Sequence, residues 1–524
     1  MAAKVQIRPD LEEFRRLAQD RRVIPVRTTI LADSLTPIGI YRVLVADQDQ
    51  PAAGTFLLES AAEGAQWSRY SFIGVSSKAT LTTKDGQAYW QGSLPVGAPQ
   101  GGDPVKAIQK TLEILHTEPL EDLPPLTSGL VGYLGWDLVR HWEKLPDRPQ
   151  DDVNLPEFAL NLVSDMAIHD NADGSLTLVA NAVNFNNTAE NVDQAYQDAL
   201  SRLEAMLAKL ARPAQQTGVS RLKDQPERQP EDAAVKHTWS EQGFLDAVEK
   251  SKKNIVDGDV FQIVISRRFE VENRASALDV YRMLRRANPS PYMYLFNFAD
   301  SSGQPFQVVG SSPEALVTLK DGLASTHPIA GSRPRGASYE EDQALAQELL
   351  ADDKERSEHL MLVDLARNDI SRIAVPGTVN VSQFMKIERF SHIMHISSTV
   401  TAQLHPDCGA YHVLRACFPA GTLSGAPKPR AMQLLDDYEP TARGIYGGVC
   451  GYFDFAGNMD MAIAIRTAVL KAGKAYVQAG AGIVMDSQPA LEAEETVNKA
   501  AAPLRAIFAA SELKPLLVNQ EEQP

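Results

Sequence analysis

The sequence predicts an α+β fold, built mainly from antiparallel sheets with helices packed against them. Three observations support this prediction. Short runs of β-branched and aromatic residues recur, turn residues separate them, and several neighbouring runs have no helical segment between them. Strands joined without a helix pair antiparallel, whereas a doubly wound parallel sheet needs a crossover helix between strands. The 524 residues could form two to four domains or one large intertwined unit.

The first part of the chain is rich in strand signals that end in one helix. Residues 54–60 (GTFLLES), 128–136 (SGLVGYLGW) and 175–185 (SLTLVANAVNF) carry β-forming side chains between turn residues. Residues 195–210 (AYQDALSRLEAMLAKL) have the period of an amphipathic helix. We therefore expect an N-terminal region over residues 1–210.

A change of composition divides the chain after that helix. Residues 211–237 contain many Gln, Pro and charged residues and few large apolar ones, which predicts a linker or exposed loop. The second region, residues 238–515, opens with Thr238 and Glu241 at the spacing of a capping box, which predicts a helix start. Its strand-like runs are residues 260–271, 291–298 and 306–319.

Two helices of the second region carry pairs of glutamates. A long helical block is expected over residues 338–369, and it contains Glu355 and Glu358. The last helix is expected to be capped by Asp486 or Ser487, with Pro489 at an early position and Glu492 and Glu495 in its first two turns. Residues spaced i,i+3 share one helix face, so each pair presents two carboxylates together. Carboxylates that face one cavity repel one another unless a divalent cation lies between them.

The composition excludes several classes of protein. A net charge of −16 without a basic stripe argues against a nucleic-acid or anionic-membrane partner. Cys408, Cys417 and Cys450 form no CxxC pair, so we expect a reducing compartment and no zinc site. The N-terminus has no apolar core, and no run approaches the roughly 18 apolar residues of a membrane span. A cytoplasmic protein is expected.

Ten motifs follow one another in a fixed order. They are DVFQIVISR (259–267), GSSPEALV (310–317), HPIAGSRPRG (327–336), ERSEHLMLVDLARND (355–369), FSHIMHISSTV (390–400), PAGTLSGAPK (419–428), GIYGGVCGYFDF (444–455), MAIAIRTAVL (461–470), QAGAGIVMDS (478–487) and EAEETVNKA (492–500). In this order they resemble the chorismate-utilising enzymes, and among them the large subunits of anthranilate synthases. The resemblance covers nearly the whole chain and implies a large intertwined sandwich of antiparallel sheets.

The resemblance also implies how chorismate would be bound. It implies Mg²⁺ between Glu358 and Glu495, with Glu355 and Glu492 acting through waters. Arg466 would bind a substrate carboxylate through its planar fork. The remaining substrate contacts implied are Gly331, Ser332, Thr422, Tyr446, Gly480, Ala481, Gly482 and Lys499. Ser332 stands where the family commonly has threonine, so the hydroxyl is kept and a methyl group is lost.

Two residues resemble the family's acid and histidine. Glu314 would protonate the departing ring hydroxyl, which requires a raised pKa such as an apolar surround supplies. His395 would lie near the enolpyruvyl group and assist the loss of pyruvate.

Gln262, the third residue expected at the catalytic centre, and Ala330 separate the sister activities. Isochorismate and salicylate synthases activate water with a lysine where this chain has Gln262, and a neutral amide takes no proton near pH 7. The para-directed aminodeoxychorismate synthases have a lysine where this chain has Ala330. Both positions favour ortho amination of chorismate by ammonia and elimination of pyruvate to give anthranilate. Component I of aminodeoxychorismate synthase and a relative that releases the aminated intermediate are the alternatives, followed by a non-catalytic homologue and an unrelated acidic binding protein.

A partner and an inhibitor complete the expectations. The chain has no glutaminase-like nucleophile elbow around its cysteines, which implies a separate glutamine amidotransferase subunit as the source of ammonia. One segment contains Glu59 and Ser60, and another contains Pro291, Tyr292 and Met293. These two segments resemble the walls of the family's tryptophan site, which implies feedback inhibition by tryptophan.

Overall fold

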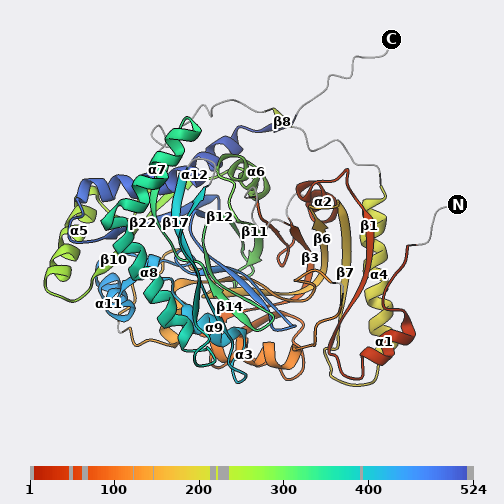
Figure 1. The fold of residues 1–524 in the computed structure, drawn as a ribbon. Coiled ribbons are helices and arrows are strands. Elements are labelled where there is room, and N and C mark those ends of the chain that lie inside the picture. The colour runs from red at the N-terminus through yellow and green to blue at the C-terminus, as the bar shows by residue number, and fades with distance from the viewer. Residues whose placement is uncertain are drawn as a thin grey trace, which may run out of the picture.

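The computed structural model confirms the α+β class. Helices flank an extensive antiparallel sheet, whose longest pairings are β3 with β6 and β10 with β22 (Figure 1). In the part of the chain that the structure describes, no helix is long and apolar enough to cross a membrane. The described residues are 5–46, 51–61, 69–121, 123–145, 147–212, 220–221, 235–389 and 393–515.

The predicted strands and helix of the N-terminal region are present as β2, β5, β7 and α4. β6 lies among β3, β5 and β7 and is buried along its whole length, because other elements cover both of its faces. In chain order the elements are α1 (Leu11–Leu17), β1 (Val23–Leu31), α2 (Pro37–Leu44), β2 (Phe56–Glu59), β3 (Tyr70–Lys84), β4 (Gln87–Gly92), α3 (Pro104–Leu115), β5 (Gly129–Leu134), the 3-10 helix η1 (Trp136–His141), β6 (Phe158–Asp170), β7 (Ser175–Val183) and α4 (Val192–Leu210).

Most of the expected linker, residues 213–219 and 222–234, lies outside the described residues. Two short strands border it. β8 (Ser220–Arg221) pairs with β23 (Lys514–Pro515), and β9 (Lys236–His237) pairs with β10.

The second region supplies the strands and helices that carry the predicted site. The run at 306–319 forms two strands, β12 and β13, and Glu314 lies in the break between them. The elements are α5 (Glu241–Val256), β10 (Gln262–Glu272), α6 (Ala277–Ala287), β11 (Tyr292–Ala299), β12 (Pro305–Ser312), β13 (Ala315–Lys320), β14 (Leu323–Thr326), β15 (Ile329–Pro334), α7 (Tyr339–Ala351), α8 (Asp353–Ser371), β16 (Asn380–Arg389), β17 (Ile393–Gln403), α9 (Ala410–Cys417), α10 (Gly421–Ser424), β18 (Gly425–Ala426), α11 (Lys428–Tyr438), β19 (Val449–Asp454), β20 (Met459–Ile463), β21 (Thr467–Lys471), β22 (Lys474–Ile483) and α12 (Pro489–Ser511).

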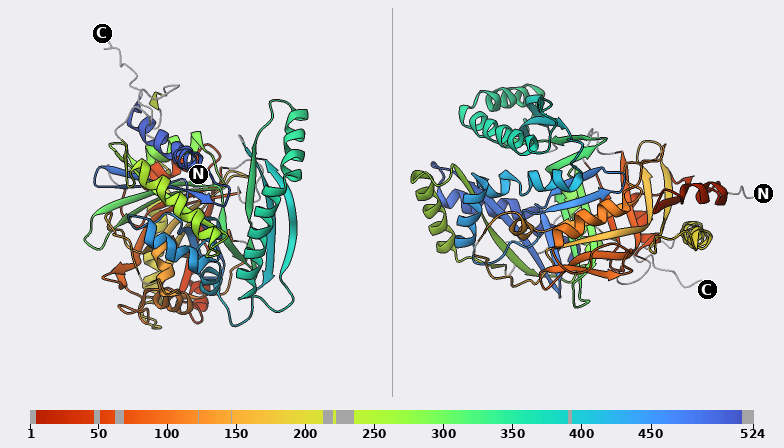
Figure 2. Two further views of the ribbon diagram at one scale, coloured as in Figure 1. Left: turned by 90° about the vertical axis from the view of Figure 1, so that its left-hand side faces the viewer. Right: turned by 90° about the horizontal axis from the view of Figure 1, so that it is seen from below.

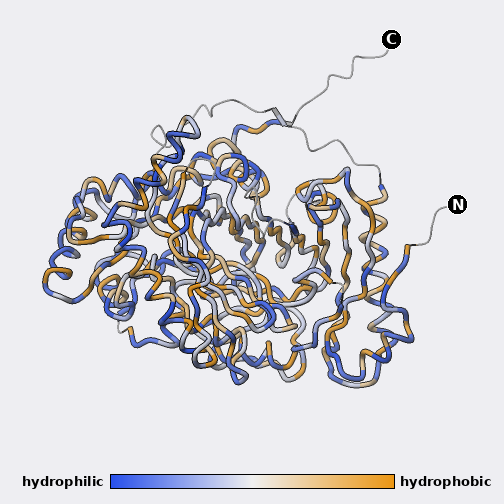
Figure 3. The backbone as a smooth tube through the Cα atoms, in the orientation of Figure 1, coloured by the Kyte–Doolittle hydropathy of each residue, from blue (hydrophilic) through white to orange (hydrophobic). Residues whose placement is uncertain are grey.

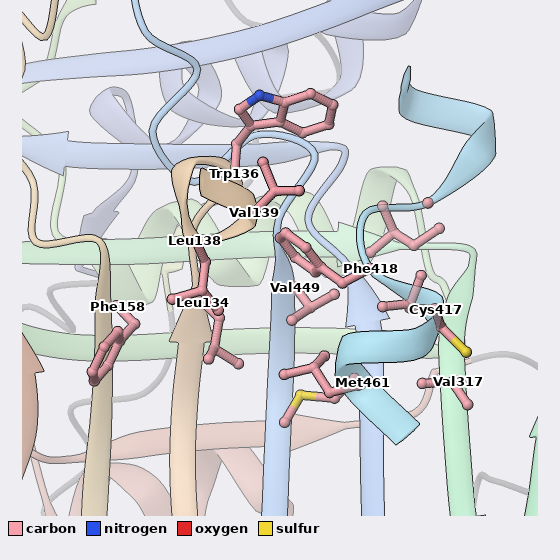
Figure 4. Close-up of a cluster of buried hydrophobic side chains, with 14 of the residues drawn as sticks. Leu134, Trp136, Leu138, Val139, Phe158, Val317, Cys417, Phe418, Val449 and Met461 are labelled. Carbon is pink, nitrogen blue, oxygen red and sulfur yellow. The ribbon is translucent and has the colours of Figure 1, made fainter. Parts of the chain in front are cut away.

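Strand pairs interlock the two regions. β2 pairs with β11, and β5 pairs with β19, so residues far apart in the chain share one sheet. Apolar and polar positions alternate along the outer helices (Figure 3). The largest core cluster combines Trp136 and Phe158 of the first region with Phe418, Val449 and Met461 of the second (Figure 4). The predicted intertwined architecture is therefore confirmed.

One lobe stands out from this body. Helices α7 and α8 and the hairpin of β16 and β17 form an arm beside the main sheet (Figure 2). β15 pairs with β17 and α8 contacts both strands, which joins the arm to the strand that carries Gly331 and Ser332.

Three helix boundaries differ from the sequence predictions. α5 begins at Glu241 with Ser240 as its cap, because the Thr238 hydroxyl instead accepts the backbone N–H of Arg268. The block at 338–369 is two helices, and Asp352 ends α7 and caps α8 with its side chain. α12 begins at Pro489 as expected but after Gln488, since the Ser487 hydroxyl accepts the N–H of Val484 in the preceding turn.

Candidate active site

Two glycines on β22 lie against two residues that are expected in the site. A Cβ atom at Gly480 would lie 2.7 Å from the Tyr446 hydroxyl, and one at Gly482 would lie 2.8 Å from Gln262 Nε2. Both distances are too short for a side chain, so glycine at these positions lets Tyr446 and Gln262 pack directly against β22. Ala481 between them pairs with β10 and is buried. The structure thus brings Gln262, Tyr446 and all three predicted β22 residues together.

Arg466 and Lys499 meet at the same place. Arg466 adopts a left-handed backbone conformation with φ of 52°, which is unusual for a residue with a side chain and clusters at functional sites. Its Nη1 donates to the Lys499 carbonyl at 2.5 Å. Burial lowers the Arg466 pKa, as expected for a cation removed from water. Lys499 Nζ lies 2.5 Å from Glu495 Oε1 and donates to the Gly480 carbonyl at 3.0 Å.

The predicted metal-binding glutamates come from α8 and α12, two helices far apart in the chain. Gln262 Nε2 donates to Glu358 Oε1 at 3.4 Å. Burial raises the Glu358 pKa, and repulsion from Glu355 and Glu495 adds to the rise. Burial also raises the pKa of Glu492, where Glu495 contributes in the same direction. The two helices therefore place mutually repelling oxygen ligands in one region, which suits a hard divalent cation. Among the described side chains, no three His, Cys, Asp or Glu residues already converge as a metal-binding group.

Arg333 is a site residue that the sequence reasoning missed. Its Nη1 lies 3.3 Å from Glu355 Oε1, and its other nitrogens reach Asp352 at 2.8 Å and Glu348 at 2.9 Å. This arginine therefore fixes Glu355 in place while partly neutralising it. The signal was available, because Arg333 lies in the motif HPIAGSRPRG and follows Ser332 directly.

Gly331, Ser332 and His395 face one another across the β15–β17 pair. Ser332 is opposite His395, and Gly331 lies at a register shift with φ of 74°. His395 Nδ1 lies 3.0 Å from the Gly331 carbonyl oxygen. A carbonyl only accepts, so Nδ1 carries the proton and Nε2 of the neutral ring is the basic nitrogen. Burial lowers the His395 pKa and so favours this neutral ring.

Glu314 and Thr422 line one pocket. The Thr422 hydroxyl donates to Glu314 Oε1 at 3.2 Å, and the apolar pocket walls include Leu362, Leu365 and Ile463. Desolvation raises the Glu314 pKa from 4.5 to about 7, against an opposing contribution from Thr422. The carboxyl group is thus protonated at neutral pH to the extent that a general acid requires.

The residues expected to bind tryptophan lie on neighbouring strands. Glu59 of β2 is opposite Met293 of β11, and the Glu59 carboxylate accepts a hydrogen bond from Tyr281 at 2.5 Å. The Ser60 hydroxyl is buried and has no hydrogen-bond partner among the residues that the structure describes. Side chains alternate along a strand, so Tyr292 faces the side opposite to Met293.

Two further residues, Asp460 and Arg443, were not singled out in the sequence analysis. Asp460 hydrogen-bonds to Tyr292, and burial raises its pKa to about 7. Arg443 lies behind the site, where it pairs with Glu439 at 2.7 Å and donates to the carbonyl of Leu423 beside Thr422. Nothing in the local sequence pattern distinguishes either residue from a surface charge.

Comparisons with known proteins identify the family of this chain. A family model described as chorismate binding enzyme matches residues 29–505. Component 1 of anthranilate synthase from Arthrobacter globiformis is 61% identical over 97% of this chain and 94% of its own length. The corresponding component from Mycolicibacterium smegmatis is 53% identical over 96% of this chain and 94% of its own length. A crystal structure of component I from Streptococcus pneumoniae superposes with a TM-score of 0.73, at 34% identity, over 91% of this chain and 99% of that one.

Proposed function

This chain belongs to the chorismate binding enzyme family, and on that basis we propose that it is the chorismate-converting subunit of an anthranilate synthase. In the proposed reaction, chorismate and ammonia give anthranilate, pyruvate and water. The relatives of highest identity described above carry this name, and they align with this chain over nearly its full length.

The observation that carries the proposal is the position of Gln262. Its amide donates to Glu358, one of the predicted metal ligands, whereas the sister enzymes that add water have a lysine base at the position of Gln262. An amide takes no proton near pH 7 and so cannot activate water, whereas ammonia attacks without such a base. Ala330 on β15 offers no amine, which argues against the para-directed route.

Glu314 would act first, as the general acid. Its proton passes to the ring hydroxyl, the carbon–oxygen bond breaks, and water leaves as ammonia adds at the ortho carbon. The Thr422 hydroxyl donates to Oε1 of Glu314, so the acidic proton is carried by Oε2. A pKa of about 7 keeps that proton available at neutral pH.

His395 would act in the second step, as a base. Its Nε2 takes the proton from the ring carbon that received ammonia, and that electron pair makes the ring aromatic. The bond between the ring carbon and the enolpyruvyl oxygen breaks, and the proton held by His395 passes to the methylene carbon of the departing group, which becomes pyruvate. The hydrogen bond from Nδ1 to the Gly331 carbonyl fixes the tautomer that this step needs.

The remaining residues would hold the substrate. The Arg466 guanidinium suits a carboxylate, and Gly480 and Gly482 leave room at β22 for Tyr446 and Gln262 to lie in the site. Glu358 and Glu495 would hold Mg²⁺, with Glu355 and Glu492 behind them. The ion would neutralise the ring carboxylate and draw electron density from the ring as the hydroxyl leaves.

A second subunit and an inhibitor belong to the same proposal. The designation component 1 of the relatives is consistent with a partner chain that supplies ammonia from glutamine. Tryptophan would bind beside Ser60, whose buried hydroxyl lacks a partner within the described part of the chain. It would inhibit by binding one conformational state better than another.

The test uses the purified chain with chorismate and Mg²⁺. We expect fluorescent anthranilate with an ammonium salt at raised pH, where free ammonia exists, and none with glutamine. Chromatography of the products then separates anthranilate from isochorismate, the para-amino isomer and the released ortho-aminated intermediate. Any of those three as the main product, or glutamine-dependent turnover by the single chain, would refute the proposal.

A further inference from the structure

A buried ion pair joins the helix of the metal glutamates to the segment that carries Thr422. Lys428 Nζ lies 2.6 Å from Asp369 Oδ2 and also donates to the Cys417 carbonyl at 3.0 Å. Asp369 belongs to the end of α8, and Lys428 is the first residue of α11. Removing charges from water is costly, so a pair kept in this position calls for a reason beyond stability.

The pair lies in the wall of the pocket that contains the acid. Asp369, Thr422 and Glu314 line the same pocket. On α8, Glu358, Leu362, Ala366 and Asp369 follow one another at spacings of three or four residues, so they share one helix face. A single rigid helix therefore presents a predicted metal ligand near its start and the anchor of the Thr422 segment near its end.

The Thr422 segment depends on a few anchors. It is short, since α10 spans Gly421–Ser424. Arg443 donates to the Leu423 carbonyl, and β18, which follows α10 directly, pairs with β10. Lys428 fixes its far end to α8. Thr422 can direct the acidic proton of Glu314 only if it stays within hydrogen-bond distance of Oε1, which is 3.2 Å away.

We propose that Lys428 and Asp369 are a positioning pair that holds Thr422 against Glu314 and so determines which oxygen of the acid carries the proton. The inference rests on the function proposed above. It assigns no contact with substrate to either residue. The pair acts through Thr422, because a misplacement of about 1 Å in a catalytic constellation can cost on the order of 100-fold in rate.

The pair has a second measurable consequence, on the pH profile. A hydrogen bond to a carboxylate lowers its pKa, so loss of the Thr422 donor should raise the pKa of Glu314. An acid works only while protonated, so the fall of kcat at high pH should then move to higher pH. The charged or titratable groups around Glu314 are His327, Lys499, Asp369, Lys428 and Cys417.

The decisive variant is the paired replacement Lys428→Met with Asp369→Asn, which leaves no unpaired buried charge and no net charge change near Glu314. At saturating chorismate and free ammonia, we expect kcat to fall about 10- to 100-fold. We also expect the fall of kcat at high pH to move to higher pH. In a Thr422→Val background the same replacement should cost less than about twofold further, because the pair would act only through that hydroxyl.

A matched control exists elsewhere in the fold. Lys471 and Asp300 form a Lys–Asp pair at 3.0 Å with side chains 14% and 12% exposed, against 12% and 9% for Lys428 and Asp369. Lys471→Met with Asp300→Asn removes an equally buried pair that joins β21 to the segment before β12. In this variant, kcat and the high-pH limb of its pH profile should stay as in the wild type.

The outcomes separate the two proposals. A wild-type chain that makes no anthranilate would overturn the proposed function. An active wild type whose paired variant matches the control, or loses rate equally with and without Thr422, would overturn the positioning role alone. If the paired variant does not fold, Asp369→Asn alone keeps the shape of the site. Its kcat loss should likewise disappear in the Thr422→Val background, and a loss that persists there overturns the inference.

Discussion

Replacing the acid Glu314 by glutamine should make the protein more stable and less active at once. The side chain lies in an apolar pocket, and desolvation raises its pKa from 4.5 to about 7. Below pH 4.5, the ordinary pKa of glutamate, the carboxyl group is neutral in both the folded and the unfolded state. Between pH 4.5 and about 7 the unfolded chain ionises while the folded chain retains its proton, so the wild type loses stability as pH rises. Glutamine has the same shape and never ionises.

The magnitude follows from the size of the pKa change. At about 1.4 kcal/mol per pKa unit, a rise from 4.5 to about 7 corresponds to at most about 3 to 4 kcal/mol. Glu314 keeps part of its surface exposed to solvent, which screens the charge, so we expect Glu314→Gln to gain about 1 to 2 kcal/mol above pH 8. Near pH 4.5 the gain should be close to zero. Loss of a general acid should lower kcat roughly 100- to 10,000-fold.

Urea unfolding of both proteins from pH 4.5 to 9 measures the difference in unfolding free energy. Asp460→Asn is the matched comparison, because burial raises the pKa of Asp460 to about 7 as well. It should show a stability gain with the same dependence on pH. A Glu314→Gln gain that is constant across pH would show that the carboxyl group is not desolvated. A variant that keeps near wild-type turnover would show that Glu314 is not the acid.

Three further predictions concern the metal, the substrate and the inhibitor. Glu358→Gln or Glu495→Gln should abolish Mg²⁺-dependent turnover and weaken Mg²⁺ binding in calorimetry by at least about tenfold without unfolding the chain, and near wild-type activity at limiting Mg²⁺ would contradict the assignment. Arg466→Lys should raise KM for chorismate about 10- to 100-fold because an ammonium lacks the planar fork, so an unchanged KM would remove Arg466 from the substrate site. Ser60→Arg should fill the inhibitor slot and abolish tryptophan inhibition while catalysis stays largely intact; unchanged tryptophan affinity in this variant would refute the site, and wild-type affinity unaffected by saturating chorismate with Mg²⁺ would refute the coupling.

Local sequence signals predicted the elements and missed some of their ends. The strand run at 54–60 and the helix run at 195–210 appear as β2 and α4, because each pattern matches the period of the element it forms. The cap of α5 was wrong since the Thr238 hydroxyl bonds to Arg268, a residue of another strand. A capping pattern states which donors a side chain can satisfy locally, whereas tertiary contacts decide which donor it meets.

The site shows the same division between local and distant information. The glutamate pairs are visible in the sequence because a helix brings residues three apart together. The contacts that determine how those groups behave join distant positions, such as Lys428 with Asp369, 59 residues apart, and Tyr281 with Glu59, 222 residues apart. From its own segment alone, each of these charged or polar groups would be predicted to be exposed to solvent. Only burial in the folded chain gives it a specific hydrogen-bond or ion-pair partner. A sequence motif can therefore name the groups that do the chemistry, while their proton affinities and orientations arise from packing that no single segment encodes.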